Sequence, residues 1–574
     1  MVASDAALAT TGPFSALDAE LHLRIFSLLG QDDLLRCVFE VCKGWRALRR
    51  DPALWRSVAL CSPKFSSAGA LAFVSGPRSP LSSPACVQEL KIEGKQAFGA
   101  ATLETLLLTL THVTRISLRG NHLTPELLLL LAEPRAAPLE RLELQLKHGE
   151  VEGVSDEMQA ALQDVFVASP ALTSLSVNMV MGSWLLDAAE RSFLARGRVK
   201  HPLRKLHIGS YSYISCESGY QCGMCAWVLS LLGAAFPELT SIAVASLRLL
   251  DVPGSLPWRP FAALRTLRVA NLGDYPWMPR ATTSAQLQQL LSCIAGAAPN
   301  LTTLELSRGE EHLSPQEIHD GVQPTPLPFV GAGAGGVFAL QQLQTLKLRF
   351  VHITAADAAD AHLPSLRELH LDDCGAHAAA AAVVLAAAAP ALQFLMLDVH
   401  ETELDGSEGP GVGALSALSH GTLSELRIFS SIECFSHTAR GQRAAEVKAA
   451  KAFAHEIKAL ATRKALPALR SLQLGAVHTH PCFAASQPWP LLQSLGLYSW
   501  ATADSIPACL AGLRAPALTE LTLPGIRSGV ASVKSRHDKP PTKAMVDAYE
   551  ALRAKGHAPK LPPLRTAGAS ADAE

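Results

Sequence analysis

Residues 17–55 have the sequence LDAELHLRIFSLLGQDDLLRCVFEVCKGWRALRRDPALW, in which apolar residues fall at helical spacing in two runs. The first run, spaced i, i+4, i+7 and i+8, predicts one buried helix face made of Leu21, Ile25, Leu28 and Leu29. The second run predicts a further helical stretch through Leu34, Val38, Val41, Trp45 and Leu48. These helices are too short to bury an independent hydrophobic core, and we therefore expect a partner to complete the core.

Residues that begin and end helices lie at the edges of these runs. Ser and Asp accept hydrogen bonds from first-turn amides, glycine ends helices, and proline is accepted at their first position. The expected caps are Ser15 with Asp18 for the first helix, Gly30 at its end, Asp32 or Asp33 for the second run, and Asp51 before Pro52 for a third.

The length and charge of the chain limit its class. At 574 residues it is far longer than one ordinary core, which predicts several domains or one long repeat array. Its 50 basic and 51 acidic residues cancel, so no salt-dependent attraction to nucleic-acid phosphates is expected. The N-terminal MVASDAALATTG does not resemble a secretory signal, and the longest apolar run, 378–389, is too short to span a bilayer.

The cysteine pattern bears on the compartment. Twelve cysteines scattered over so long a chain do not resemble a disulfide framework, which favours a reducing compartment. We therefore expect the protein in the cytoplasm and/or the nucleus, with no membrane partner and no nucleic-acid partner.

Beyond residue 86 one pattern recurs, with apolar residues at its first, fourth and sixth positions. It occurs fifteen times between residues 87 and 523, and successive units begin from 23 residues apart (343 to 366) to 46 residues apart (423 to 469). The pattern predicts a short strand in each unit, whose alternate side chains face the interior. Because no unit can bury its leucines alone, the units are expected to stack into a parallel sheet. The helices expected outside it include 102–110, 284–298 and 378–389.

The first stretch resembles an F-box. The resemblance is carried, in order, by Leu17 and Glu20, Ile25-Phe26, DLLRC at 33–37, VCKGWR at 41–46 and DPALW at 51–55. It departs from the family at Asp18, where proline usually follows the first leucine. The later units resemble leucine-rich repeats, although the asparagine usual three residues after the last strand leucine is present once, as Asn121, and Cys374 occupies that place in a second unit.

Together the resemblances imply an α/β fold with a helical N-terminal module and a solenoid whose curved parallel sheet lies inside and whose helices lie outside. The expected boundaries are an F-box at 14–61, a linker at 62–86, a leucine-rich-repeat solenoid of fifteen irregular repeats at 87–530, and a mostly disordered tail at 531–574 with one helix near 544–555.

The implied function is that of a substrate-recognition subunit of a Skp–cullin–F-box ubiquitin ligase, which serves ubiquitin-dependent protein degradation and is not itself an enzyme. Its expected partners are a Skp-type adaptor, through it a cullin, and a target protein. The alternative is a leucine-rich-repeat interaction scaffold with a degenerate F-box, which Asp18 leaves open. The expected adaptor-binding residues are Leu17, Leu21, Ile25, Phe26, Leu34, Val41 and Trp45.

The outward positions of the strands mix basic and acidic residues, which argues against a general polyanion groove. Lys347, Arg349 and Arg427 are candidates for a local anion pocket, with solvated surface charges as the alternative. The expected target-binding residues are Arg119, Lys205, Lys347, Arg349, His370, Arg427 and Tyr498.

Two loose groups of metal-ligating residue types lack a complete ligand set. They are Cys216, Cys222 and Cys225, with His207 as a candidate fourth ligand, and His478, His480 and Cys482. A structural zinc needs four ligands, usually in closely spaced pairs, so we expect ordinary thiols, no metal and no cofactor. The sequence contains no phosphate-binding loop and no hydrolase or metalloprotease motif, so no catalytic residues are expected.

Overall fold

The computed structural model divides the chain into two compact units. The first comprises Met1–Met224 with Val228–Ala245, and the second comprises Cys225–Trp227 with Ser246–Glu574. The structure describes residues 17–61, 66–77, 79–81, 83–93, 98, 100–119, 125–133, 137–145, 156–178, 201–209, 224–225, 229, 232–233, 236–245, 247–248, 260–273, 280–308, 327–328, 336–372, 374–375, 377–399, 414–430, 459–460, 466–475, 489–498, 510, 513–523, 526–527 and 543–562.

The first unit begins with short helices. They are α1 (Ala19–Phe26), α2 (Gln31–Asp33), a π-helical turn (Leu34–Val38), α3 (Phe39–Val41), α4 (Lys43–Ala47) and two 3-10 turns (Leu48–Arg50 and Pro52–Trp55). The second apolar run is therefore not one helix. It breaks at Cys42, whose backbone is extended (φ −154°, ψ 166°) and whose Sγ accepts a hydrogen bond from the Trp45 amide at 3.4 Å, starting α4.

The helix ends differ in part from the predicted caps. Asp18 is itself the cap of α1, because its Oδ1 accepts from the Leu21 amide at 2.7 Å; Ser15 lies outside the described residues. Ser27, not Gly30, is the residue that ends α1. Gly30 has an extended backbone and precedes α2, so neither Asp32 nor Asp33 is the N-cap of that helix. Asp51 caps the turn that begins at Pro52, as predicted, and accepts from the Ala53 amide at 2.9 Å.

An aromatic core holds these helices together. Trp55 is fully buried, and its Nε1 donates to the Arg49 carbonyl at 2.6 Å. Its ring lies 6.3 Å from that of Phe39, and 5.7 Å from that of Phe73 in the next helix, α5 (Ser67–Ser75). The module is therefore packed directly against the first helix of the repeats.

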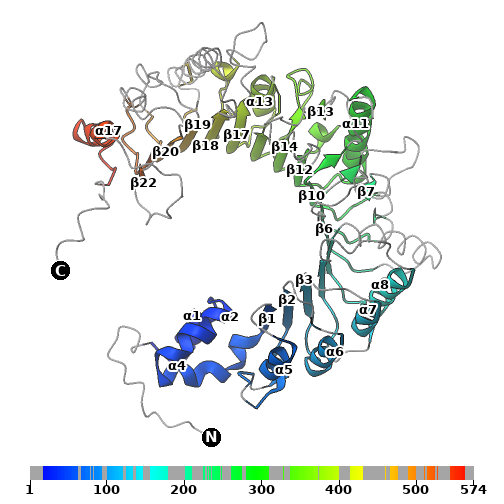
Figure 1. Cartoon of the computed structure of the whole chain (residues 1–574). Helices are drawn as coiled ribbons and strands as arrows, with labels where there is room; N and C mark the ends of the chain where they lie inside the picture. The colour runs from blue at the N-terminus through cyan, green and yellow to red at the C-terminus, as the bar shows by residue number, and fades with distance from the viewer. Residues whose placement is uncertain are drawn as a thin grey trace, which may run out of the picture. The chain divides into compact units, whose positions relative to one another are not determined.

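Seven parallel strands follow in the first unit, each paired with the next. They are β1 (Ser57–Cys61), β2 (Glu89–Glu93), β3 (Arg115–Arg119), β4 (Arg141–Gln145), β5 (Ser174–Asn178), β6 (Lys205–Gly209) and β8 (Ser241–Val244). The fourth-position apolar residues of the repeats lie opposite one another across the sheet, as Leu90, Ile116 and Leu142 do. Helices α5, α6 (Ala100–Thr109), α7 (Pro125–Ala132) and α8 (Asp156–Ala168) lie along one side of these strands (Figure 1).

Strand β1 precedes the predicted start of the repeats. Trp55, Val58 and Leu60 have the apolar spacing of the later units, so β1 belongs to the array although it lies inside the predicted F-box range. The predicted linker at 62–86 contains α5 and a 3-10 turn (Pro84–Cys86), so these segments are part of the packed repeats.

The side chain of Gln31 links α2 to the outer edge of β1. Its Nε2 donates to the Ala59 carbonyl at 3.0 Å, and its Oε1 accepts from the Ala59 amide at 2.8 Å. An unpaired strand edge offers its amides and carbonyls to any other chain. The side-chain amide of Gln31 therefore gives hydrogen-bond partners to the Ala59 amide and carbonyl in the middle of this edge.

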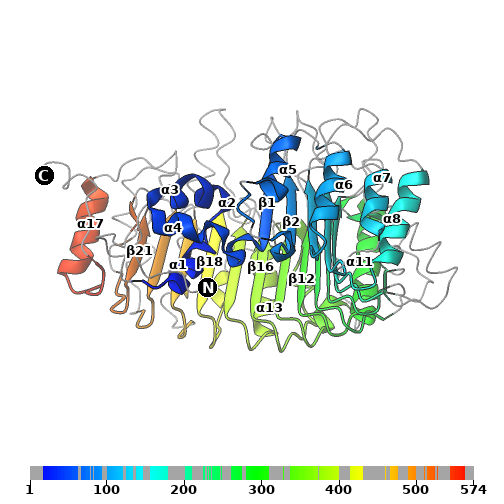
Figure 2. The same cartoon turned by 90° about the horizontal axis from the view of Figure 1, so that it is seen from below.

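The second unit repeats the design. Its parallel strands are β10 (Thr266–Val269), β12 (Thr303–Ser307), β14 (Thr345–Arg349), β16 (Glu368–Asp372), β17 (Phe394–Val399), β18 (Glu425–Ser430), β19 (Ser471–Gly475), β20 (Ser494–Tyr498) and β21 (Glu520–Leu523), to which β22 (Ile526–Arg527) pairs antiparallel. Figure 2 shows the strands of this unit in one row. Leucines occupy the fourth position in each of these nine strands and lie opposite one another.

The second unit also contains helices, 3-10 turns and short strands outside this row. They are α11 (Arg280–Ala297), α13 (Ala378–Ala387), the 3-10 turns Val337–Ala339 and Leu415–Ala417, and the short strands β7 (Met224–Cys225, whose first residue belongs to the first unit), β9 (Leu247–Arg248), β11 (Leu272–Gly273), β13 (Leu327–Pro328) and β15 (Val351–His352). The helices expected at 102–110, 284–298 and 378–389 are thus confirmed as α6, α11 and α13. Among the helices that the structure describes, none is both long and apolar enough to cross a membrane.

Cys374 performs the bridging that asparagine performs in regular repeats. It is fully buried, and its Sγ lies 3.2 Å from the Leu348 carbonyl on the preceding strand of the sheet. The thiol thus satisfies a backbone acceptor between two repeats. Asn121 lies outside the described residues.

The C-terminal region closes the second unit. The helix expected near 544–555 is confirmed as α17 (Lys543–Ala554), but residues 555–562, expected to be disordered, also pack. Ala558 and Leu561 are buried, and the Tyr549 hydroxyl donates to the Pro562 carbonyl at 2.6 Å. The His557 carbonyl accepts from the Ala515 amide at 2.9 Å. A terminal repeat needs such a cover over its apolar interior, which explains why residues 555–562 pack against the second unit.

Candidate functional site

The apolar stripe of α1 faces solvent rather than the core. Four side chains, here called the α1 surface, are exposed: 42% at Leu21 and 38% at Ile25 on the helix, and 86% at Leu28 and 40% at Leu29 in the turn that follows it. The adjacent face of the helix carries the buried His22 and Phe26, which pack against Trp45 with ring centroids 5.8 and 5.0 Å away. The prediction of a buried face was therefore wrong: the core uses two residues displaced by one position, about 100° around the helix.

The predicted adaptor-binding residues divide into two groups. Leu21 and Ile25 are exposed, as is Val41 in α3, with 62% of its surface accessible. Phe26 and Leu34 are buried in the core of the module, so their assignment to partner contact is corrected to a structural role. Leu17 and Trp45 are half-buried. Leu28 and Leu29 were missed as surface residues, although their spacing already placed them on the same stripe.

The start of α1 is well supported although it lacks the usual proline. In addition to the cap by Asp18, the His22 Nδ1 lies 3.0 Å from the Asp18 carbonyl. Glu20 and Arg24 form an exposed ion pair at 2.6 Å one turn apart. The residue that departs from the F-box pattern thus stabilises the helix that presents the α1 surface.

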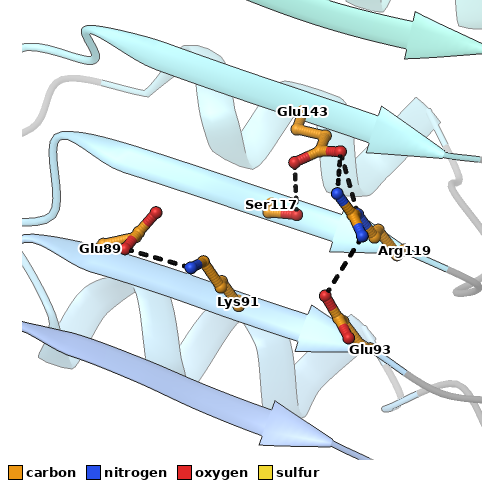
Figure 3. Close-up of polar contacts among 6 residues, drawn as sticks. All are labelled: Glu89, Lys91, Glu93, Ser117, Arg119 and Glu143. Carbon is orange, nitrogen blue, oxygen red and sulfur yellow. Dashed lines mark hydrogen bonds and ion pairs between the residues drawn. The ribbon is translucent and has the colours of Figure 1, made fainter. Parts of the chain in front are cut away.

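A second candidate site is the strand face opposite the helices. In the first unit, Arg119 joins two carboxylates on neighbouring strands, with Nη2 2.6 Å from Glu143 Oε1 and Nη1 3.6 Å from Glu93 Oε1 (Figure 3). Ser117 donates to Glu143 Oε2 at 3.0 Å, and Lys91 lies 3.4 Å from Glu89. Every cation drawn in this group therefore has a carboxylate neighbour.

Glu89 shows how the charges on this face balance. Burial raises the pKa of its carboxyl, but a 2.6 Å hydrogen bond from Ser57 and the positive charges of Lys91 and Arg141 together bring the pKa below its usual value. Glu89 is therefore ionised at neutral pH.

Lys205 and His207 lie on β6. Lys205 is exposed, whereas the His207 Nδ1 lies 3.0 Å from the Ser176 hydroxyl. Cys216 and Cys222, as well as His478, His480 and Cys482, lie outside the described residues. In the part of the chain that is described, no group of three metal-ligating side chains could hold an ion.

The three candidates for an anion pocket in the second unit lie beside carboxylates. Glu305 lies 3.1 Å from both Arg268 and Lys347, Asp372 lies 3.0 Å from Arg349, and Glu425 lies 2.6 Å from Arg427. The three candidate cations each have a carboxylate partner, so they belong to a network of ion pairs.

An aromatic stack lies among these ion pairs. The rings of His370 and Phe394 are stacked with centroids 4.7 Å apart, and the Arg427 guanidinium lies 5.0 Å from the Phe394 ring centre. Burial, with the positive charges of Lys347 and Arg427, lowers the pKa of His370 to about 4 against the opposing effect of Glu305. His370 is therefore neutral at pH 7, and its 3.9 Å contact with Glu368 is then no ion pair. Tyr498 ends β20, and its side chain lies outside the described residues.

Phe394 was missed by the sequence analysis. It stands directly before the leucine pair of its strand, so the alternation that predicts the interior residues also places it on the outer face. Its neighbours His370 and Arg427 come from units that begin 26 and 31 residues away, and only the parallel pairing brings them together.

Comparison with known proteins identifies the N-terminal module. Residues 19–61 match the family described as F-box-like. These residues form an F-box-like domain. The search of curated proteins found no match to this chain.

Two solved structures are similar to the chain at low identity. The chain in the crystal structure of the TLR13–ssRNA13 complex is 15% identical with a TM-score of 0.38, over 81% of this chain and 60% of that chain. A leucine-rich-repeat protein of Leptospira interrogans is 13% identical with a TM-score of 0.30, over 83% of this chain and 96% of that chain. Neither likeness carries an argument at these scores. The strand register establishes that the F-box-like domain is followed by leucine-rich repeats.

The F-box-like domain and the repeats share a strand. The family match ends at residue 61, which is also the last residue of β1. Through Gln31, Trp55 and β1 itself, the F-box-like domain is joined to the repeats by hydrogen bonds, ring packing and strand pairing.

Proposed function

We propose that this chain is the substrate-recognition subunit of a Skp–cullin–F-box ubiquitin ligase, acting in the cytoplasm and/or the nucleus. The supporting observation is the α1 surface, four exposed apolar side chains on α1 and in the turn that follows it, within an F-box-like domain. Contiguous apolar surface of this kind marks a protein–protein interface, since its removal from water stabilises the complex by roughly 25 cal/mol per Å². The proposed occupant is a Skp-type adaptor, which connects the chain to a cullin.

The repeats would hold the target protein. Their outer strand faces carry paired charges that favour a specific partner over any polyanion, with Arg119 and Lys205 in the first unit and the stack of His370, Phe394 and Arg427 in the second. The chain needs no catalytic residue for this task. Holding a target lysine near a ubiquitin thioester raises its effective concentration, and the chemistry belongs to other subunits.

The test is a binding measurement between the full chain and a purified Skp-type adaptor. The Leu21→Asp/Ile25→Asp variant places two charges within the α1 surface and is expected to weaken binding by about 100-fold or more. The matched control is Leu108→Asp/Leu129→Asp, which changes two exposed leucines on α6 and α7. Both variants should keep the melting temperature of the wild type, because all four side chains face solvent.

Each outcome separates the candidate functions. Wild-type binding that is lost only in the α1 variant supports the ligase subunit. Equal binding by the α1 variant contradicts it. A wild-type chain that binds no adaptor supports the alternative, an interaction scaffold with a degenerate F-box. Asp18 alone does not favour that alternative, because it caps α1 and keeps its surface in place.

A further inference from the structure

The helices of the first unit carry a second exposed apolar surface, far from α1 in the sequence. Leu108 on α6 is 60% exposed, Leu129 on α7 is 46% exposed, and Val167 on α8 is 60% exposed. The three helices are consecutive and lie side by side in both views (Figures 1 and 2). Each therefore contributes one apolar side chain to what we call the outer-helix surface.

These apolar residues do not belong to the interior stripes of their helices. On α6 the buried residues include Leu103, Leu106 and Leu107, and on α7 they are Leu127, Leu128 and Leu131. Leu108 comes directly after the buried Leu107, and Leu129 directly after the buried Leu128, and both side chains are exposed to solvent. Packing within the chain thus does not account for leucine at these positions.

The charged residues within the three helices are all acidic. An exposed acidic residue lies one turn before each apolar residue: Glu104 before Leu108, Glu126 before Leu129, and Asp164 before Val167. The sequences of α6, α7 and α8 contain no lysine and no arginine. This one-sided charge contrasts with the near-zero balance of the whole chain, which has 50 basic and 51 acidic residues.

We propose that the outer-helix surface binds a basic amphipathic helix of a partner protein. Apolar side chains that each lie one helical turn from an acidic one complement a helix with an apolar stripe flanked by lysine or arginine. Nucleic acid and anionic membranes are repelled by the same charges. This inference does not depend on the proposed ligase role, since it concerns other helices.

The spacing of the helices sets the spacing of the partner's anchors. Packed helices lie about 8–10 Å apart, so a helix that crosses α6, α7 and α8 meets an apolar residue about every 10 Å. At a rise of 1.5 Å per residue, this distance corresponds to about seven residues. The partner helix therefore carries apolar anchors at i, i+7 and i+14, which lie on nearly one face.

The test uses the full chain and a fluorescent peptide of about 18 residues, built from alanine and lysine with leucine at three positions spaced by seven. Saturable binding that weakens as salt is added is expected. The Leu108→Gln/Leu129→Gln/Val167→Gln variant should bind about tenfold more weakly or worse. The matched control is Leu491→Gln, an exposed leucine of the second unit, which should bind the peptide as the wild type does.

Several results would overturn the proposal. They are the absence of saturable binding, unchanged binding by the triple glutamine variant, and equal binding of a peptide with glutamate in place of lysine. Self-association of the chain that is lost in the triple variant would show that a second copy, not a basic helix, covers this surface. Loss of binding in the Leu21→Asp/Ile25→Asp variant would place the peptide on α1 instead.

Discussion

Replacing Gln31 by alanine should loosen the outer edge of β1 without unfolding the repeats. The substitution removes both hydrogen bonds to Ala59, at 2.8 and 3.0 Å, and leaves the Ala59 amide and carbonyl without these partners. At about 1 kcal/mol for each neutral hydrogen bond, the loss is ~2 kcal/mol of local stability. Local opening at Ala59 then becomes about 30 times more frequent.

The assay is amide hydrogen exchange resolved to single residues by mass spectrometry. The Ala59 amide should exchange about 30-fold faster in the variant, whereas the Glu89 amide, which donates to the Arg56 carbonyl, should keep its rate. Gln88→Ala, an exposed glutamine near the same strands, is the matched control. An Ala59 exchange rate within about twofold of the wild-type rate would refute the role of Gln31, because the loss of two hydrogen bonds of ordinary strength should change the rate by much more.

Three further substitutions test other contacts. Asp18→Ala should destabilise α1 by about 1 kcal/mol, seen as faster exchange of the Leu21 amide, whereas Asp18→Asn should retain the cap; equal rates in both would contradict the capping role. His370→Gln should reduce the loss of stability on acidification, because below pH 6.5 the unfolded chain binds a proton that folded His370, with a pKa of about 4, does not. The difference, about 2 kcal/mol at pH 5, is measured by urea unfolding at pH 7 and pH 5, and an unchanged pH dependence would count against it. Gly475→Ala would place a Cβ 2.7 Å from Phe429 Cδ1 and should cost about 1–3 kcal/mol, partly recovered by Phe429→Ala; a neutral effect on the melting temperature would show that the ring moves aside freely.

The repeats could be predicted because their physics is local and periodic. An L-x-L strand has to bury alternate side chains, so the position of each leucine follows from its neighbours in the sequence. The parallel register that aligns Leu346 with Leu369 and Leu395 confirms this prediction. The same spacing was present at Trp55, Val58 and Leu60, but the resemblance to an F-box assigned these residues to the helical module.

The sites were less predictable because they depend on contacts between units. Helical periodicity marks an apolar stripe but does not say whether the chain or a partner covers it, so the stripe of Leu21 and Ile25 was expected to be buried and is exposed. Likewise, Arg349 appeared available for an anion until the pairing of strands placed Asp372 3.0 Å away. In both cases the decisive neighbour lies outside the local pattern.

The strand shared by the F-box-like domain and the repeats limits how the protein can be divided in experiments. A fragment cut after residue 61 keeps β1 but removes β2, so a new strand edge from Ser57 to Cys61 would be open to aggregation. A fragment that starts after residue 61 would instead expose β2 and remove the Trp55 ring from Phe73. A chimera that exchanges F-box-like domains should therefore be joined further along the chain, in the loop after a later repeat. The α1 surface and the first repeats would then be exchanged as one piece.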